Sequence, residues 1–196
     1  MEKVIPFNGD TIIFETIKKL IAKYNIKNFI ETGTYLGQTT GAMAQVVENV
    51  YSCEINVNYF EQAKENLKSF SNITLFNTSS KQFLENVLPV IQQPALFFLD
   101  AHWQEHNPLV DELKVIAENK FCNSIITIHD FQVPEKDFGF DYADSRKHQP
   151  LNWYYIKNYI DIIYHDSYKH YYNEQAEGSK RGIIYIEPNK INYENI

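Results

Sequence analysis

A glycine-bearing turn between two apolar runs constrains the fold of this chain more than any other feature. The apolar run from Ile26 to Ile30 ends at Glu31, and Gly33 and Gly37 follow it closely. A helix-like segment and a second apolar run then lead to Glu54. Glycines let a backbone turn sharply beside a ligand, and an acid after the second run can bind ribose hydroxyls. The pattern is typical of a nucleotide-binding strand–loop–helix–strand unit.

Strand-like and helix-like segments alternate through residue 130. Their apolar spacing predicts strands over 28–32, 50–54, 73–77, 95–99 and 124–128, and helices over 11–24, 38–48, 58–70, 80–88 and 108–119. Such alternation indicates an α/β fold, a Rossmann-like doubly wound sheet that is mostly parallel. The length of 196 residues suits a single domain over residues 1–196.

The pattern changes after Asp130. Residues 131–150 have no clear period and predict a long loop, which we interpret either as a lid over the active site or as an ordered surface loop. Residues 151–159 then predict a helix. The segments 160–172 and 182–187 predict two strands joined by the polar stretch 173–180, which indicates an antiparallel hairpin.

Charge and apolar content exclude several classes of partner. The formal net charge is −7 and the basic residues are scattered, so we expect no nucleic-acid partner. No apolar run approaches the ~20 residues of a membrane span, and no signal-peptide core is visible, so we expect no membrane partner and a cytoplasmic location. Cys53 and Cys122 are expected to be core residues.

Polar residues end the predicted strands: Glu31, Glu54, Ser79, Asp100, and His129 with Asp130. Ligands of open α/β sheets bind outside the carboxyl ends of the strands. Each of these residues alone is explained as a helix cap or a turn residue. Together with the glycine turn, they indicate a site.

The glycine turn also indicates which cofactor binds. The pattern is G-x-x-x-G and not the dinucleotide pattern G-x-G-x-x-G, and Glu31 precedes it. A pyrophosphate is disfavoured beside a carboxylate. S-adenosylmethionine carries an ammonium, a sulfonium and a ribose but no phosphate, so this cofactor is favoured over NAD.

The stretch from Glu31 to Gly37 resembles the first motif of class I S-adenosylmethionine-dependent methyltransferases, and Leu99 to Trp103 resembles their fourth motif. The resemblance implies about seven strands with an antiparallel last strand. It also implies that Glu54 binds the ribose and that Ser79 lies near the adenine. The other cofactor contacts that it implies are Glu31, Thr32, Gly33, Thr34, Gly37, Thr39 and Asp100.

Within that group, the chain is similar to metal-dependent O-methyltransferases of the catechol and macrolide-sugar types. Those enzymes place one acid after the fourth strand, and an acid with an acid or amide after the fifth. Asp100 and Asp130 match, whereas His129 stands where an Asp, Glu or Asn is expected. Mg²⁺ prefers oxygen ligands and imidazole suits other metals. A divalent metal (Mg or Mn) on Asp100, His129 and Asp130, a two-carboxylate site and a metal-free centre all stay open.

Catalysis of methyl transfer to a hydroxyl requires alignment and removal of a proton. We therefore assign Asp100, His102, His129 and Asp130 as candidate catalytic residues, with the two histidines as candidate bases. For His102 and Trp103, packing over the cofactor is another interpretation.

The predicted function is S-adenosylmethionine-dependent O-methylation (EC 2.1.1.-) of a small molecule or sugar. The alternatives are a non-catalytic S-adenosylmethionine-binding module and a nicotinamide-dependent oxidoreductase. The Tyr-rich residues from 153 to 172 are open to three interpretations: a wall for the acceptor, a homodimer face, or ordinary packing.

Overall fold

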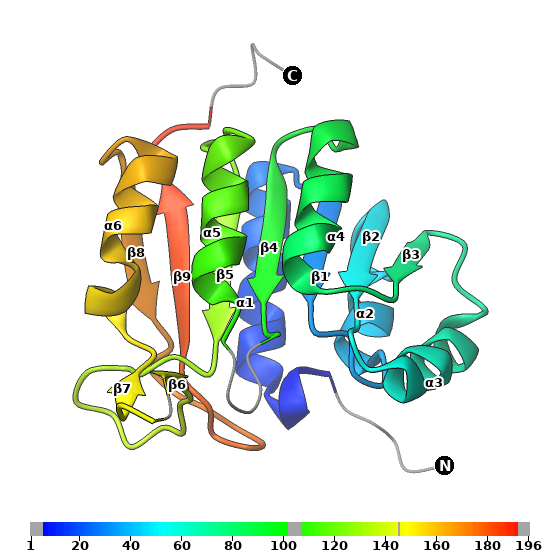
Figure 1. Ribbon diagram of the computed structural model, residues 1–196, viewed down its shortest axis with the longest axis horizontal. Coiled ribbons are helices and arrows are strands. Elements are labelled where there is room, and N and C mark those ends of the chain that lie inside the picture. The colour runs from blue at the N-terminus through cyan, green and yellow to red at the C-terminus, as the bar shows by residue number, and fades with distance from the viewer. Residues whose placement is uncertain (1–5, 102–106, 145, 192–196) are drawn as a thin grey trace.

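A seven-stranded sheet forms the centre of the protein (Figure 1). The structure is a computed structural model that describes residues 6–101, 107–144 and 146–191. The strands stand in the order β3-β2-β1-β4-β5-β9-β8. Their bounds are β1 Asn28–Thr32, β2 Asn49–Cys53, β3 Ile73–Phe76, β4 Ala95–Leu99, β5 Ile125–His129, β8 Tyr168–Tyr172 and β9 Ile183–Pro188.

The first five strands are parallel, and β9 runs antiparallel to both β5 and β8. This arrangement confirms the predicted Rossmann-like sheet with an antiparallel last strand. The five residues of β1, β4 and β5 are all buried, as expected for strands covered on both faces.

Helices cover both faces of the sheet. Figure 1 shows α4, α5 and α6 in front of the sheet and α1 behind it. The bounds are α1 Thr11–Tyr24, α2 Gln38–Met43, α3 Val57–Leu67, α4 Ser80–Val87, α5 Leu109–Glu118 and α6 Trp153–Tyr164, with short 3₁₀ helices η1 Phe7–Gly9 and η2 Leu88–Val90. Asp10 caps the start of α1, since its carboxylate accepts the N–H groups of Ile12 and Ile13.

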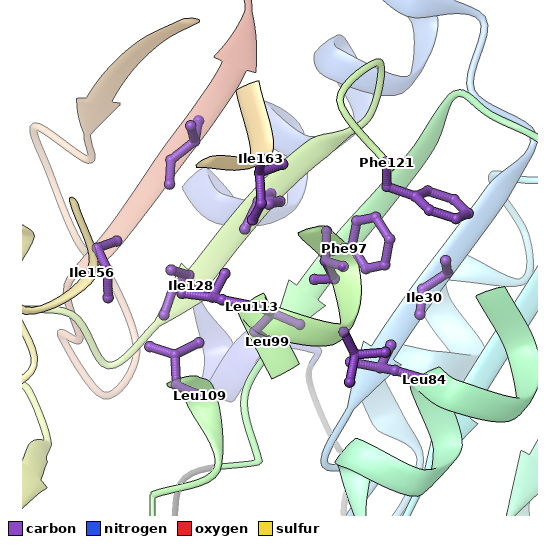
Figure 2. Close-up of a cluster of buried hydrophobic side chains, with 14 of the residues drawn as sticks. Ile30, Leu84, Phe97, Leu99, Leu109, Leu113, Phe121, Ile128, Ile156 and Ile163 are labelled. Carbon is purple, nitrogen blue, oxygen red and sulfur yellow. The ribbon is translucent and has the colours of Figure 1, made fainter. Parts of the chain in front are cut away.

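Two apolar cores lie on opposite faces of the sheet. The larger core packs α4, α5 and α6 against β1, β4, β5 and β9, and Figure 2 shows its centre. There Phe97 of β4 contacts Phe121 edge-on, with ring centroids 5.5 Å apart. The second core packs α1 and η1 against the other face, where Phe29 and Phe98 lie.

The predicted boundary between helix and strand after residue 150 was wrong. Helix α6 continues to Tyr164, so the first residues of the predicted strand 160–172 are helical, and only Tyr168–Tyr172 forms β8. The reason is packing, because a helix buries Ile156, Ile160 and Ile163 together in the larger core. The helix ends at His165, which adopts a left-handed conformation.

Two smaller corrections concern α2 and the long loop. Helix α2 ends at Met43 and not at residue 48, because the chain turns there through short-range bonds such as Val46 N–H to the Met43 carbonyl before β2 begins. The predicted loop 131–150 contains two short antiparallel strands, β6 Tyr142–Asp144 and β7 Gln149–Pro150. None of the helices in the described ranges combines the length and apolarity that a membrane crossing requires.

The buried side chain of Phe97 provides a test of the larger core. Phe97→Ala should lower the free energy of unfolding by about 3–5 kcal/mol, because it removes buried area and leaves a cavity. Urea unfolding measures the loss. Tyr154→Ala is the matched control, since the Tyr154 side chain is 89% exposed, and should change stability by no more than about 0.5 kcal/mol. Equal losses in both variants would contradict this assignment of the core.

Candidate active site

The candidate residues gather at one edge of the sheet, where the parallel strands end. Glu31 lies near the end of β1, Glu54 follows β2, Asp100 follows β4, and His129 is the last residue of β5. In Figure 1 this edge is at the lower side of the sheet, near β6 and β7. The fold therefore brings together groups that are up to about a hundred residues apart in the chain.

The glycine turn joins the ends of three strands. Gly33 has φ +89°, which favours glycine, and a Cβ built there would lie 2.6 Å from the carbonyl oxygen of Asp100. The N–H groups of Gly33 and Thr34 both donate to the carbonyl oxygen of Cys53, at 3.0 and 2.9 Å. The turn after β1 is thus bonded to the end of β2 and lies against the end of β4.

Glu54 is bonded to the glycine turn. One carboxylate oxygen accepts the N–H of Tyr35 at 2.9 Å, and the other accepts the N–H of Asn56 at 2.8 Å. Each oxygen of a carboxylate can accept more than one hydrogen bond, so capacity remains for hydroxyl donors. The neighbouring side chain of Ile55 is 74% exposed, which places an apolar surface beside the carboxylate.

Glu31 lies beneath the turn and is buried. Its Oε2 accepts hydrogen bonds from the hydroxyls of Ser52 and Thr40, and the Ser52 hydroxyl also lies 2.6 Å from that of Thr34. Burial, with a smaller contribution from the charges of Asp100 and Glu54, raises the pKa of Glu31 to about 7, although the two hydroxyls act in the opposite direction. The residue therefore ties β1, β2 and α2 together.

Three other predicted cofactor contacts have hydrogen bonds within the protein. The hydroxyl of Thr32 accepts the N–H of Asp100 at 3.2 Å, and that of Thr39 accepts the N–H of Phe7 at 3.0 Å. The hydroxyl of Ser79 accepts the N–H of Gln82 at 3.4 Å and so caps α4. Their contact with a cofactor stays a prediction.

A second group of polar residues forms beside the turn. The Nδ1 atom of His129 lies 3.0 Å from Oδ1 of Asp100 and 3.2 Å from Oδ1 of Asp130. One ligand atom from each residue lies within 4.8 Å of the others, so the three side chains could hold a metal ion. Asp130 has φ +55°, a left-handed conformation that is uncommon for a residue with a side chain and is enriched at functional sites.

The donor set of this group fits a divalent metal. Two carboxylates and one imidazole suit Mn²⁺ better than Mg²⁺, which prefers oxygen ligands throughout. The separations of 3.0 and 3.2 Å also match hydrogen bonds from a protonated imidazole. The same three residues are thus suited to hold either a proton or a metal ion.

Without a metal, His129 favours its protonated form. Burial opposes the charge on its imidazole, but the carboxylates of Asp100 and Asp130 outweigh this effect and raise the pKa of His129 to about 9. Its Nε2 atom has no hydrogen-bond partner among the described residues, and the ring of Phe98 lies 5.7 Å away. His102 and Trp103 lie outside the described residues.

Arg181 is a member of this group that the sequence analysis did not identify. Its Nε donates to Asp130 and its Nη2 donates to Asp141. Arg181 comes just before β9, which pairs antiparallel with β5 and begins with Ile183 opposite His129. The predicted antiparallel hairpin was the available signal, because it returns the chain to the carboxyl end of the sheet.

Comparison with known proteins extends this picture. No protein-family model and no curated protein matches the chain. Among solved structures, a candidate O-methyltransferase from Klebsiella pneumoniae has a TM-score of 0.63 at 16% identity, over 97% of this chain and 84% of its own.

Two further structures show the range of the likeness. An O-methyltransferase from Bacillus cereus, solved with S-adenosylhomocysteine, has a TM-score of 0.56 at 16% identity over 89% of this chain and 79% of its own. An rRNA methylase from Streptococcus thermophilus has a TM-score of 0.57 at 12% identity, over 90% of this chain and 97% of its own. At these identities the likeness concerns the fold. The chain has the fold of class I S-adenosylmethionine-dependent methyltransferases.

The raised pKa of His129 predicts a pH dependence of stability. Folding raises this pKa from 6.5 to about 9, so the folded protein binds the proton more tightly than the unfolded chain. The resulting stabilisation is complete below about pH 6.5 and is lost as the pH rises through about 9. Urea unfolding in EDTA should therefore show the stability difference between wild type and His129→Gln shrinking over this range. A difference that is constant with pH would contradict the assignment.

Proposed function

We propose that the protein is an S-adenosylmethionine-dependent methyltransferase that transfers a methyl group to a hydroxyl oxygen of a small molecule or sugar. One observation carries this proposal. An acid-lined glycine turn and a separate centre of two carboxylates and an imidazole meet at the carboxyl edge of a sheet with the methyltransferase fold. The first part suits a cationic, phosphate-free cofactor, and the second suits removal of a proton.

The hydrogen bonds of the turn support S-adenosylmethionine over a dinucleotide. A pyrophosphate requires open backbone N–H groups. Here the N–H groups of Gly33 and Thr34 bond to Cys53, and that of Tyr35 bonds to Glu54. A ligand therefore meets the Glu54 carboxylate, which can accept bonds from ribose hydroxyls, beside the exposed side chain of Ile55, which offers an apolar surface to the adenine.

The chemistry of the second group assigns roles to its members. S-adenosylmethionine supplies an activated methyl group when it is bound, so the chain must align the acceptor oxygen and take its proton. At neutral pH a protonated His129 has no free lone pair at Nδ1, because its pKa is raised to about 9. We therefore assign Asp100, whose side chain is 25% exposed, as the proton acceptor that His129 orients through the 3.0 Å contact. His102 stays a candidate base.

A divalent metal would be held by Asp100, His129 and Asp130, and when bound it would lower the pKa of the acceptor hydroxyl. It would take the place of the proton on His129, because a metal ligand must be deprotonated. The chain's own contribution is then to hold three donors on two neighbouring strand ends.

Charge supports a neutral acceptor. Asp100, Asp130 and Asp141 surround the centre, with Arg181 bonded to two of them, and the chain as a whole carries −7. An anionic acceptor such as RNA is disfavoured by this excess of negative charge. The free cysteines Cys53 and Cys122 suit a reducing compartment, and we propose that the enzyme acts in the cytoplasm.

Titration of S-adenosylhomocysteine into the protein tests the cofactor. We expect micromolar or tighter affinity, about −8 kcal/mol. Glu54→Gln should weaken the affinity about 10–100-fold, because a charged hydrogen-bond acceptor contributes about 1.5–3 kcal/mol. The control is Glu48→Gln, which removes a charge from an exposed pair with Lys27, and it should bind like wild type.

The outcomes of this titration separate the alternatives. Binding of NAD in preference to S-adenosylhomocysteine would favour a nicotinamide-dependent oxidoreductase and overturn the proposal. Cofactor binding without methyl transfer to any member of a broad panel of hydroxyl acceptors would favour a non-catalytic binding module.

Metal binding is tested separately by electron paramagnetic resonance of Mn²⁺. The wild-type protein should bind Mn²⁺ more tightly than Mg²⁺ in competition, because an imidazole is among the donors. Asp100→Asn should weaken Mn²⁺ binding by at least about 10-fold. Asp111→Asn is the control, since Asp111 forms an exposed pair with Lys114 on α5. Equal Mn²⁺ affinity in both variants would contradict the site.

A further inference from the structure

Arg181 connects two acidic side chains that belong to different parts of the chain. Asp130 directly follows β5, and Asp141 directly precedes β6. The guanidinium donates from Nε to the first carboxylate and from Nη2 to the second. A guanidinium is planar and offers its donors in a fixed fork, so it can bridge two carboxylates in a way that a lysine ammonium cannot reproduce.

The backbone around this bridge is built to accommodate it. The Gly139 N–H donates to the Lys180 carbonyl at 2.8 Å, and the Gly182 N–H donates to the Gly139 carbonyl at 2.9 Å. A Cβ at position 139 would lie 3.0 Å from both Cδ and Nη1 of Arg181. Glycine at this position therefore leaves room for the side chain of Arg181 between the two segments.

Asp130 is the member of the reaction centre that most needs support. It holds a left-handed backbone conformation, which is unfavourable for a residue with a side chain and persists only where the surrounding structure supports it. Its Oδ1 accepts the Arg181 bond and also lies 3.2 Å from Nδ1 of His129. Its carbonyl oxygen accepts the N–H of Asp141 at 2.8 Å. The bridge therefore fixes both the side chain and the following segment.

We propose that Arg181 is a positioning residue of the reaction centre. Its guanidinium bridges Asp130 and Asp141, and thereby holds the Asp130 carboxylate beside His129 and residues 139–141 against the residues that precede β9. Its effect on methyl transfer rests on the proposed function, whereas its effect on the geometry of His129 does not.

This role predicts a separation between cofactor binding and turnover. Arg181 contacts Asp130, Asp141 and the vicinity of Gly139, whereas the glycine turn follows β1 and is bonded to the end of β2. Loss of the bridge should leave S-adenosylhomocysteine affinity within about twofold of wild type. It should lower kcat on the order of 100-fold, since a misplacement of about 1 Å at a reaction centre costs that much.

The experiment compares four variants with wild type. Arg181→Gln removes the charge and the bridge, and Arg181→Lys keeps the charge without the bridge. Asp141→Asn weakens only the bond from Nη2 of Arg181. Lys157→Gln is the control, because it removes a positive charge from an exposed pair with Asp161 on α6. Circular dichroism checks that each variant is folded.

Two readouts are measured on each folded variant. The first is the low-field proton NMR resonance of the His129 Nδ1–H in EDTA, assigned by its loss in His129→Gln. The second is kcat and KM for methyl transfer. Both Arg181 variants should shift or lose the resonance and lower kcat, Asp141→Asn should give a smaller change, and Lys157→Gln should give none.

The result that overturns the proposal is a wild-type His129 resonance in Arg181→Gln. A wild-type kcat in Arg181→Lys would show that charge suffices and would overturn the bridging role. Failure of the proposed function looks different: the wild-type protein would then neither bind S-adenosylhomocysteine nor transfer a methyl group. In that case, the His129 resonance would still test the role of Arg181. If the Arg181 variants do not fold, the same resonance is measured in Asp141→Asn, and a wild-type resonance there overturns the proposal.

Discussion

Burial of the central sheet on both faces is the constraint on which the rest of the structure depends. Every residue of β1, β4 and β5 is buried, and most of their side chains are apolar. Charged groups are costly inside such a sheet unless they are bonded, so they are placed where the strands end. Because these strands are parallel, their carboxyl ends meet at one edge, and the polar ends become a site.

The few polar groups near the ends of these strands illustrate the same constraint. Glu31 remains buried because the hydroxyls of Ser52 and Thr40 satisfy one of its oxygens, and burial raises its pKa to about 7. His129 remains buried because Asp100 and Asp130 face its Nδ1 atom. At each position, a partner from a neighbouring strand end or from the adjoining helix offsets the cost of desolvation.

The sequence predicted the parts of the fold that depend on local periodicity. The short apolar run Ala95–Leu99 predicted a buried strand and the spacing in Thr11–Tyr24 predicted a helix, and the structure agrees with both. Around Ile160 the same apolar residues suit a strand or a helix, and only packing against the sheet and α5 favours the helix. Local pattern cannot decide such a segment.

In the candidate site, too, some residues are marked by local sequence pattern and others only by contacts between distant segments. Residues that directly follow an apolar run, such as Glu54 and Asp100, are identifiable because the run itself marks the strand end. Arg181 is not, since its importance arises from the pairing of β9 with β5, a contact between segments some fifty residues apart. Its partner Asp141 lies in a segment without periodicity, so no local pattern marks either residue.

A close approach between backbone segments joins the two halves of the proposed site. Gly33 allows the turn after β1 to lie against the backbone of Asp100, where any other residue would place a Cβ 2.6 Å from the carbonyl oxygen. The N–H of Asp100 in turn donates to both the carbonyl and the hydroxyl oxygen of Thr32, at 3.1 and 3.2 Å. The turn proposed to hold the methyl donor and the acid proposed to take the proton are therefore joined mainly through backbone atoms, with one further bond to the Thr32 hydroxyl. For the proposed methyl transfer, the alignment of donor and acceptor would then be set by the sheet itself.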